Sequence, residues 1–172
     1  MRIGIPKEIR AEEKRVAAIP ETVIKYVKMG FTVVIQATAG EGVYVRDDDY
    51  RKAGASVVPS AEELFATSDV ILKVKQPVFN ESAQKHEAEM LREGSILITF
   101  LHPAAPANHP LVLMLRERNF TSFTMDGIPR ISRAQRMDAL TSMSTVTGYR
   151  SVIIAANHLS KFIPMIGTAI GT

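Results

Sequence analysis

Short runs of β-branched and apolar residues alternate with helix-like segments along the whole chain. We expect strands at residues 2–5, 31–35, 55–59, 69–75, 95–101 and 120–126. We expect helices at residues 20–28, 48–52, 61–66, 82–93 and 108–119, and a long one from 138 to about 162. The connections are too long for hairpins, so consecutive strands should lie parallel. The pattern predicts an α/β fold, flavodoxin-like or Rossmann-like, with helices on both faces of a mostly parallel sheet and a long C-terminal helix.

Local signals support two of these elements. Ser60 and Glu63 have the spacing of a capping box, in which each side chain bonds the other residue's backbone N–H at a helix start. In the strand at 69–75, Lys73 and Lys75 should point toward the same face, because side chains two apart in a strand do so.

Composition narrows the class of protein. With 172 residues, 46% apolar and 23% charged, the chain is long enough for one well-packed domain. Its 21 basic and 18 acidic residues are scattered, which favours neither nucleic acid nor an anionic membrane surface as a partner. The absence of cysteine excludes disulfides and thiolate chemistry. No stretch approaches the ~18 apolar residues of a membrane span, so we expect no direct membrane insertion.

A polar loop follows the last expected strand, at the point where open α/β sheets bind ligands. It begins with Pro129, which disfavours helix before it, and brings Arg130 and Gln135 close to Asp138. Guanidinium groups here could bind phosphate or carboxylate oxygens, and the amide with Asp138 could read a carboxamide. Equally, the arginines could lie in solvent while Asp138 caps the long helix.

The stretch PRISRAQ, followed by MDAL and GYR, resembles the signature loop of proton-translocating nicotinamide nucleotide transhydrogenases, in their NAD(H)-binding subunit. The resemblance implies that Arg130, Gln135 and Asp138 contact the dihydronicotinamide ring and its ribose. The family usually has serine three residues after the aspartate, where this chain has Thr141. The hydroxyl is kept, so the resemblance implies an assisting contact from Thr141.

Three further residues follow strands and could meet at one edge of the sheet. Arg15 lies in the charged loop after the first strand, and Lys75 and His102 lie at or just after later strand ends. The segments RVAAIP, LKVK and TFLH around them resemble the pyruvate site of alanine dehydrogenases, whose N-terminal domain is related. There the Arg and Lys bind the keto acid and the His transfers a proton. A lone histidine at a strand end is also commonly structural or solvated, and that alternative stays open for His102.

Neither a metal site nor a glycine-rich phosphate cradle is expected. His86, His109 and His158 have no metal-ligand spacing, and no strand is followed by a G-x-G-x-x-G motif. In the resembling family, the Rossmann domain that holds most of NAD(H) begins next. The resemblance therefore implies that residues 1–163 form an alanine dehydrogenase/transhydrogenase N-terminal-type domain, and that residues 164–172 form a hinge toward that NAD-binding domain.

The resemblance implies hydride transfer between NAD(H), held here, and NADP(H), held on a partner domain, coupled to proton translocation. It implies a homodimer in the cytoplasm, attached peripherally to the inner membrane through NADP(H)-binding and membrane-spanning subunits. The chain by itself is expected to be inactive. Two alternatives remain: an alanine dehydrogenase that reductively aminates pyruvate with NADH, and a non-catalytic dimerisation or interaction module.

Overall fold

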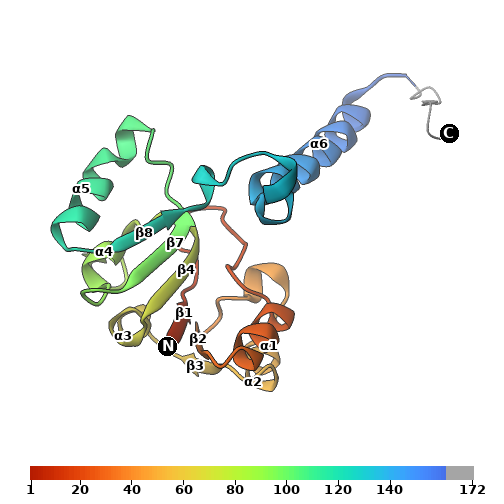
Figure 1. The fold of residues 1–172 in the computed structure, drawn as a ribbon. Coiled ribbons are helices and arrows are strands. Elements are labelled where there is room, and N and C mark those ends of the chain that lie inside the picture. The colour runs from red at the N-terminus through yellow and green to blue at the C-terminus, as the bar shows by residue number, and fades with distance from the viewer. Residues whose placement is uncertain (162–172) are drawn as a thin grey trace. The chain divides into compact units, whose positions relative to one another are not determined.

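The computed structural model describes residues 1–161, and the chain divides into two compact units (Figure 1). The first unit is Met1–Gly127, and the second begins at Ile128. Each unit is described separately below. The predicted hinge at residues 164–172 lies outside the described residues.

The first unit is built on a six-stranded sheet whose hydrogen-bonded neighbours are all parallel. Its strands are β1 (Arg2–Ile5), β2 (Thr32–Gln36), β3 (Ser56–Val58), β4 (Val70–Lys75), β7 (Ile96–Phe100) and β8 (Thr121–Thr124). They lie in the order β3-β2-β1-β4-β7-β8, which is the Rossmann order 3-2-1-4-5-6 and not the flavodoxin order. The α/β prediction is confirmed, and the topology is now decided.

Helices cover both faces of this sheet (Figure 1). The helices are α1 (Pro20–Lys28) and α2 (Asp47–Lys52) on one face, and α3 (Ala61–Thr67), α4 (Glu87–Met90) and α5 (His109–Glu117) on the other. Alternate strand residues serve the two faces: Ile3 and Ile5 pack with Val23 and Tyr50, whereas Ile71 packs with Leu64. The result is two apolar cores, one on each side of the sheet.

Gly4 stands where β1 passes directly under α3. An added Cβ would lie 2.3 Å from Ser68 Oγ and 2.9 Å from side-chain carbons of Leu64 and Ile71. Ser68 is itself held there, because its hydroxyl donates to Leu64 O at 2.6 Å. Glycine at this position therefore allows the helix to approach the strand closely.

The helix predicted at residues 82–93 is wrong. A two-stranded antiparallel hairpin, β5 (Phe79–Asn80) and β6 (Lys85–His86), occupies much of that segment, and only Glu87–Met90 is helical. The segment carries too few apolar residues to bury one face of a three-turn helix. Instead, Asn80 Oδ1 accepts the Ala83 N–H and closes the turn, and His86 Nδ1 accepts the Ala88 N–H as the N-cap of α4.

Most other boundaries agree to within two residues. One half of the predicted capping box forms, since Ser60 Oγ accepts the Glu63 N–H at 3.0 Å. Three short 3₁₀ segments complete the unit: η1 (Glu41–Val43), η2 (Pro106–Asn108) and η3 (Met125–Gly127).

The second unit contains the loop and the long helix. A 3₁₀ segment, η4 (Ser132–Met137), leads into α6 (Ala139–His158). The helix ends at His158, because Leu159 is extended, and Phe162, at the predicted helix end, lies outside the described residues. Within residues 1–161, no helix combines the length and apolarity needed to cross a membrane.

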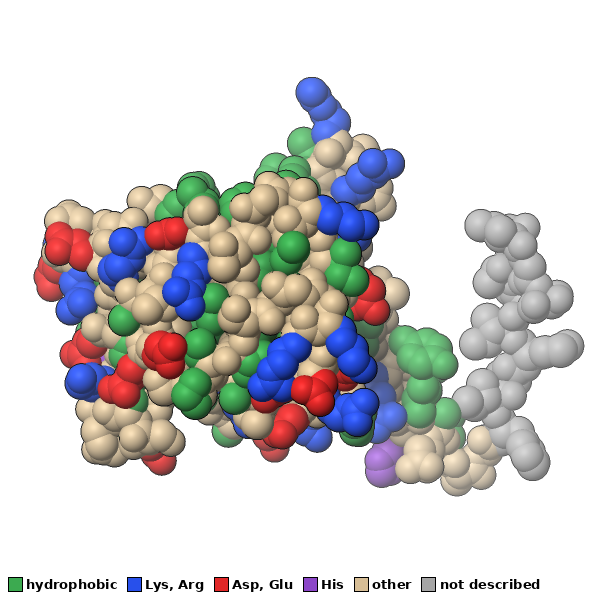
Figure 2. All heavy atoms as spheres, turned by 90° about the horizontal axis from the view of Figure 1, so that it is seen from below, with side chains coloured by type: hydrophobic (Ala, Val, Ile, Leu, Met, Phe, Trp, Pro, Cys, Tyr) green, Lys and Arg blue, Asp and Glu red, His purple; other side chains and the backbone are tan. Residues whose placement is uncertain are grey.

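Charged side chains of both signs are interspersed on the face drawn in Figure 2. This distribution agrees with the scattered charges of the sequence.

Candidate functional site

The strand order reverses between β1 and β4, and this switch point is where open α/β sheets form a ligand crevice. The loop after β1 and the carboxyl ends of β4 and β7 meet along this edge. Lys75, at the end of β4, pairs with Phe100 at the end of β7, two residues before His102. The predicted convergence of the Arg15, Lys75 and His102 segments on adjacent strand ends is therefore present in the fold.

Arg15 is held by a neighbouring carboxylate. Its Nε and Nη2 donate to Glu13 Oε1 and Oε2 at 2.8 and 2.6 Å, and its backbone N–H donates to Glu13 Oε1 at 3.0 Å. The hydrogen bond from the Arg15 side chain is the main cause that lowers the pKa of Glu13 to about 2. The Arg15 backbone N–H and the charge of Lys75 lower it further. The charges of Arg15, in this loop, and of Lys75, at the end of β4, thus both act on the Glu13 carboxylate.

Lys73 and Lys75 have different environments, although we expected them to point toward the same face. Lys73 is buried, whereas Lys75 is only partly buried, and the β4–β7 register shifts between Leu72 and Lys75. A bulge interrupts the simple alternation of a strand. Lys75 alone of the two belongs with the residues at the sheet edge.

Lys73 instead lies in a buried cluster with two carboxylates. Its Nζ is 2.9 Å from Glu87 Oε1 and 3.5 Å from Glu8 Oε2. Glu8 also accepts the backbone N–H groups of Val74 and Lys75, which lie beyond the end of the β1–β4 pairing. Burial raises the pKa of Glu8 despite the opposing charge of Lys73. Through these bonds Glu8 fixes the end of β4 beside the switch point.

The imidazole of His102 contacts the carboxylate of Asp126. His102 Nδ1 lies 2.7 Å from Asp126 Oδ1, and its backbone N–H donates to Asp126 Oδ2 at 2.8 Å. Burial acts to raise the pKa of Asp126, but hydrogen bonds from Thr124 and His102 outweigh it, and the pKa is lowered. Because Nδ1 faces the carboxylate, Nε2 is the ring nitrogen left for other partners. A proton carried there could be exchanged with a bound molecule.

His102 also has a backbone conformation that is uncommon for a non-glycine residue, with φ of 48°. Asn108 supports it, since its amide donates to Leu101 O and His102 O at 3.1 Å each. The ring stacks on Phe100. The strand end is therefore built to hold this histidine in one orientation.

The loop in the second unit presents a different set of groups. Arg130 and Gln135 are exposed, and within the described part of the chain neither side chain has a hydrogen-bond partner. Asp138 is buried and caps α6: Oδ1 accepts the Thr141 N–H at 3.0 Å and Oδ2 accepts the Thr141 hydroxyl. These bonds, with help from the charge of Arg130, lower the pKa of Asp138. The capping role that the sequence left open for Asp138 is therefore present.

Sequence reasoning missed Glu8, Glu13, Glu87 and Asp126. The first two lie in the charged loop after the first strand. Their partners are far away in the chain or visible only from side-chain geometry, so no local pattern marks them. Among the described residues, no group of three or more His, Asp or Glu is arranged to hold a metal ion.

Comparison with known proteins shows which family this chain belongs to. A model described as the alanine dehydrogenase/PNT N-terminal domain matches residues 4–147. The chain belongs to this family. The match includes Arg15, Lys75 and His102 together with Arg130, Gln135 and Asp138.

Relatives of the chain include both a transhydrogenase subunit and an alanine dehydrogenase. The chain is 42% identical over 171 residues to the NAD(P) transhydrogenase subunit alpha of Cereibacter sphaeroides, a match that covers 99% of this chain and 31% of that protein. It is 36% identical over 161 residues to the alanine dehydrogenase of Methanococcus maripaludis, covering 94% of this chain and 40% of that protein. The chain thus spans less than half the length of these relatives.

Solved structures of the same two kinds of enzyme resemble this chain. The transhydrogenase of Sinorhizobium meliloti superimposes with a TM-score of 0.84 at 39% identity, covering 99% of this chain and 48% of that one. An L-alanine dehydrogenase superimposes with a TM-score of 0.68 at 34% identity, covering 78% of this chain and 34% of that one. The family resemblance inferred from the sequence motifs is confirmed.

Proposed function

We propose that this chain is the N-terminal domain of the NAD(H)-binding component of a proton-translocating transhydrogenase. The observation that carries the proposal is that the exposed Arg130 and Gln135 side chains, which make no hydrogen bond within residues 1–161, precede a helix cap formed by Asp138 and Thr141. The similarity of almost the whole chain to a transhydrogenase alpha subunit supports it.

The loop suits the nicotinamide end of NAD(H). The Gln135 amide offers one donor group and one acceptor, the complement of a carboxamide, and Arg130 offers donors for ribose or carboxamide oxygens. The 172 residues contain no G-x-G-x-x-G motif, so the chain offers no dinucleotide phosphate cradle of that kind. We therefore assign to it contacts with the ring end, and leave the remainder of the cofactor to another domain.

The contribution of these residues is positioning. NAD(H), when bound, supplies the hydride that NADP⁺ on a partner domain accepts. Arg130 and Gln135 would hold the ring in one orientation, and Asp138 with Thr141 would keep the start of α6 rigid behind the loop. Direct transfer between two rings needs alignment and exclusion of water, and it needs no acid or base at that step.

The assembly follows from the same proposal. The domain would act in a homodimer on the cytoplasmic side, attached to the inner membrane through NADP(H)-binding and membrane-spanning subunits. Sedimentation of the chain over a range of concentrations tests the dimer. A single monomer species at every concentration would contradict that part of the proposal.

The decisive experiment measures hydride transfer from NADH to a spectroscopically distinct NADP⁺ analogue in the complete complex that carries this domain. Gln135→Asn shortens the amide by one methylene and should lower the transfer rate by about 10²-fold, because a misplacement of about 1 Å can cost that much. Gln84→Asn is the matched control, since Gln84 lies on the β5–β6 turn and has a positive φ that asparagine tolerates. An unchanged rate in Gln135→Asn would refute the assigned role.

Alanine dehydrogenase activity is the second candidate, favoured by the His102–Asp126 contact after β7, the strand that pairs with the end of β4 at Lys75. In that reaction His102 would give a proton to the substrate while NADH gives the hydride. The same preparation should be assayed with pyruvate and ammonia. Pyruvate-dependent NADH oxidation that disappears in His102→Ala would establish this candidate in place of the first.

A further inference from the structure

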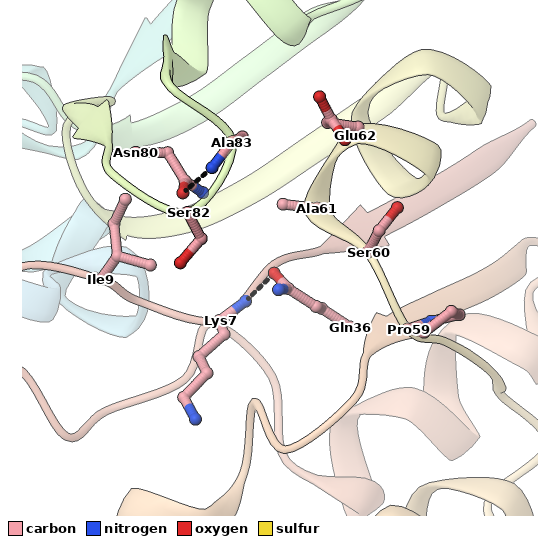
Figure 3. Close-up of a pocket in the computed structure, with 10 residues that line it drawn as sticks. All are labelled: Lys7, Ile9, Gln36, Pro59, Ser60, Ala61, Glu62, Asn80, Ser82 and Ala83. Atoms are coloured by element: carbon pink, nitrogen blue, oxygen red, sulfur yellow. Dashed lines mark hydrogen bonds between the residues drawn. The ribbon is translucent and has the colours of Figure 1, made fainter.

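A pocket of about 490 Å³ with both polar and apolar lining lies at the carboxyl edge of the sheet, on the side of β2 and β3 (Figure 3). It is lined by residues after β1 and β3, the last residue of β2, the start of α3 and the β5–β6 hairpin, all of which belong to the first unit. Its volume falls in the range of small-molecule sites, about 300–1,000 Å³. Neither the proposed transhydrogenase role nor the alanine dehydrogenase candidate uses its lining residues.

Two side-chain amides in the pocket have fixed orientations. Gln36 Oε1 accepts the Lys7 N–H and Asn80 Oδ1 accepts the Ala83 N–H, each at 3.0 Å (Figure 3). A backbone N–H can only donate, so the oxygen of each amide is identified and the NH₂ group takes the other position. Within residues 1–161, neither NH₂ group has an acceptor.

Asn80 makes the strongest case for a built site. Its side chain is fixed by the hairpin turn and the residue is only 6% exposed, yet its NH₂ group stays unpaired at the pocket wall. The nitrogen is not among the fully buried polar atoms that lack a partner, so it stays accessible from the pocket. A ligand oxygen in the pocket would satisfy this donor.

Two hydroxyl groups add donors and acceptors around the amides. Ser60 Oγ accepts the Glu63 N–H, which leaves its own hydrogen to donate. Ser82 points into the space between the hairpin and Lys7 (Figure 3). Ile9 and Ala61 supply apolar surface between these groups.

The charged residues at the rim are engaged elsewhere. Lys7 Nζ turns away from Asn80 and donates to Thr38 Oγ1 at 2.8 Å. Glu62 lies 3.9 Å from Lys85, at the outer surface. An anionic ligand would therefore lie near the Glu62 carboxylate with no cation free to bind it. A cationic ligand would face the NH₂ donors of the two amides.

We propose that this pocket binds a neutral, hydroxyl-bearing small molecule of monosaccharide or nucleoside size. Each ligand hydroxyl can accept from Asn80 or Gln36 and donate to a serine oxygen. The apolar lining takes the ring face.

The test is a titration of the isotopically labelled full chain, followed by the side-chain amide resonances of Gln36 and Asn80. The probes are D-ribose, D-glucose and adenosine, with acetate and inorganic phosphate as charged comparisons. At least one neutral probe should shift both amide resonances saturably, and the charged probes should not.

Isosteric variants test the orientation of the donors. Asn80→Asp and Gln36→Glu keep the acceptor for the backbone N–H but replace the NH₂ donor, and each should weaken binding of that probe at least about tenfold. Asn119→Asp, the same change at an exposed residue outside the pocket, should leave binding unchanged. Ser82→Ala, at an exposed residue, gives a second test that does not disturb the hairpin turn and should weaken binding about threefold.

Three results would overturn the proposal. The first is the absence of saturable shifts with every neutral probe. The second is preferential binding of acetate or phosphate. The third is undiminished binding in Asn80→Asp and Ser82→Ala.

Discussion

Lys73 Nζ lies 2.9 Å from Glu87 Oε1 in the core of the first unit, and each side chain is 1% exposed. Glu87 uses its other oxygen to accept the Val78 N–H at 3.0 Å. The pair therefore joins the central strand β4 to the short helix α4 and to the segment between them. A buried ammonium with two carboxylates around it depends on all of its partners.

Lys73→Met should destabilise the protein by about 3–5 kcal/mol, because it leaves Glu8 and Glu87 buried without a cation. Denaturant unfolding followed by circular dichroism measures the change. Lys85→Met is the matched control, since Lys85 is exposed and 3.9 Å from Glu62, and it should change stability by less than about 1 kcal/mol. Equal effects of the two substitutions would contradict the buried cluster.

The Arg15–Glu13 pair should make stability depend on acid. The pKa of Glu13 is lowered to about 2 in the folded protein from an ordinary value of 4.5, so its contribution is present above pH 4.5 and is lost as pH falls toward 2. Glu13→Gln should be less stable than the parent by about 1 kcal/mol at pH 7, with Arg15 partly exposed, and the two should converge near pH 2. Urea unfolding at several pH values provides the comparison, and a difference independent of pH would show that the carboxylate is not responsible.

Gly4→Ala should lower stability by about 1–3 kcal/mol, because the added carbon would lie 2.3 Å from Ser68 Oγ and the strand and helix must separate. Thermal unfolding is the measurement. Gly148→Ala serves as the control: nothing lies within 4 Å of the added carbon there, and alanine favours the helix interior, so stability should stay the same or rise. A neutral Gly4→Ala would mean that α3 does not rest on β1 at this point.

Asp126→Asn should separate a structural from a catalytic role for His102. The substitution removes the charge that faces His102 Nδ1 at 2.7 Å and should cost about 1–2 kcal/mol of stability. Under the proposed transhydrogenase function, NADH-to-NADP⁺ hydride transfer in the complete complex should change less than about twofold, since that step needs no acid or base. A tenfold loss of transfer with an unchanged melting temperature would instead give the pair a role in the reaction.

Local patterns predicted much of the fold. The runs at β1 and β7 are apolar and bounded by turn residues, and Pro20 marks the start of α1, so these elements lie where expected. The prediction of a helix at residues 82–93 failed because its first part belongs to a hairpin, whose strand pairing and Asn80–Ala83 bond helical periodicity does not reveal.

Some residues of the candidate site could be proposed from local patterns, and others could not. The residues of the polar loop, Arg130 and Gln135, could be proposed from the sequence because their motif is long and contiguous. Glu8 was not found, because its bonds to Val74 and Lys75 join residues 66 and 67 positions apart. The bulge that separates the environments of Lys73 and Lys75 also arises only when β4 pairs with β7.

The sequence alone determined the α/β class, the parallel sheet and the family, because hydrophobic periodicity, chain chirality and contiguous motifs are local properties. Only the tertiary structure decided which charges are buried, which carboxylate holds Arg15 or His102, and where the amides of Gln36 and Asn80 point. Those outcomes depend on pairings between distant segments, whose energies exist only once the strands have assembled.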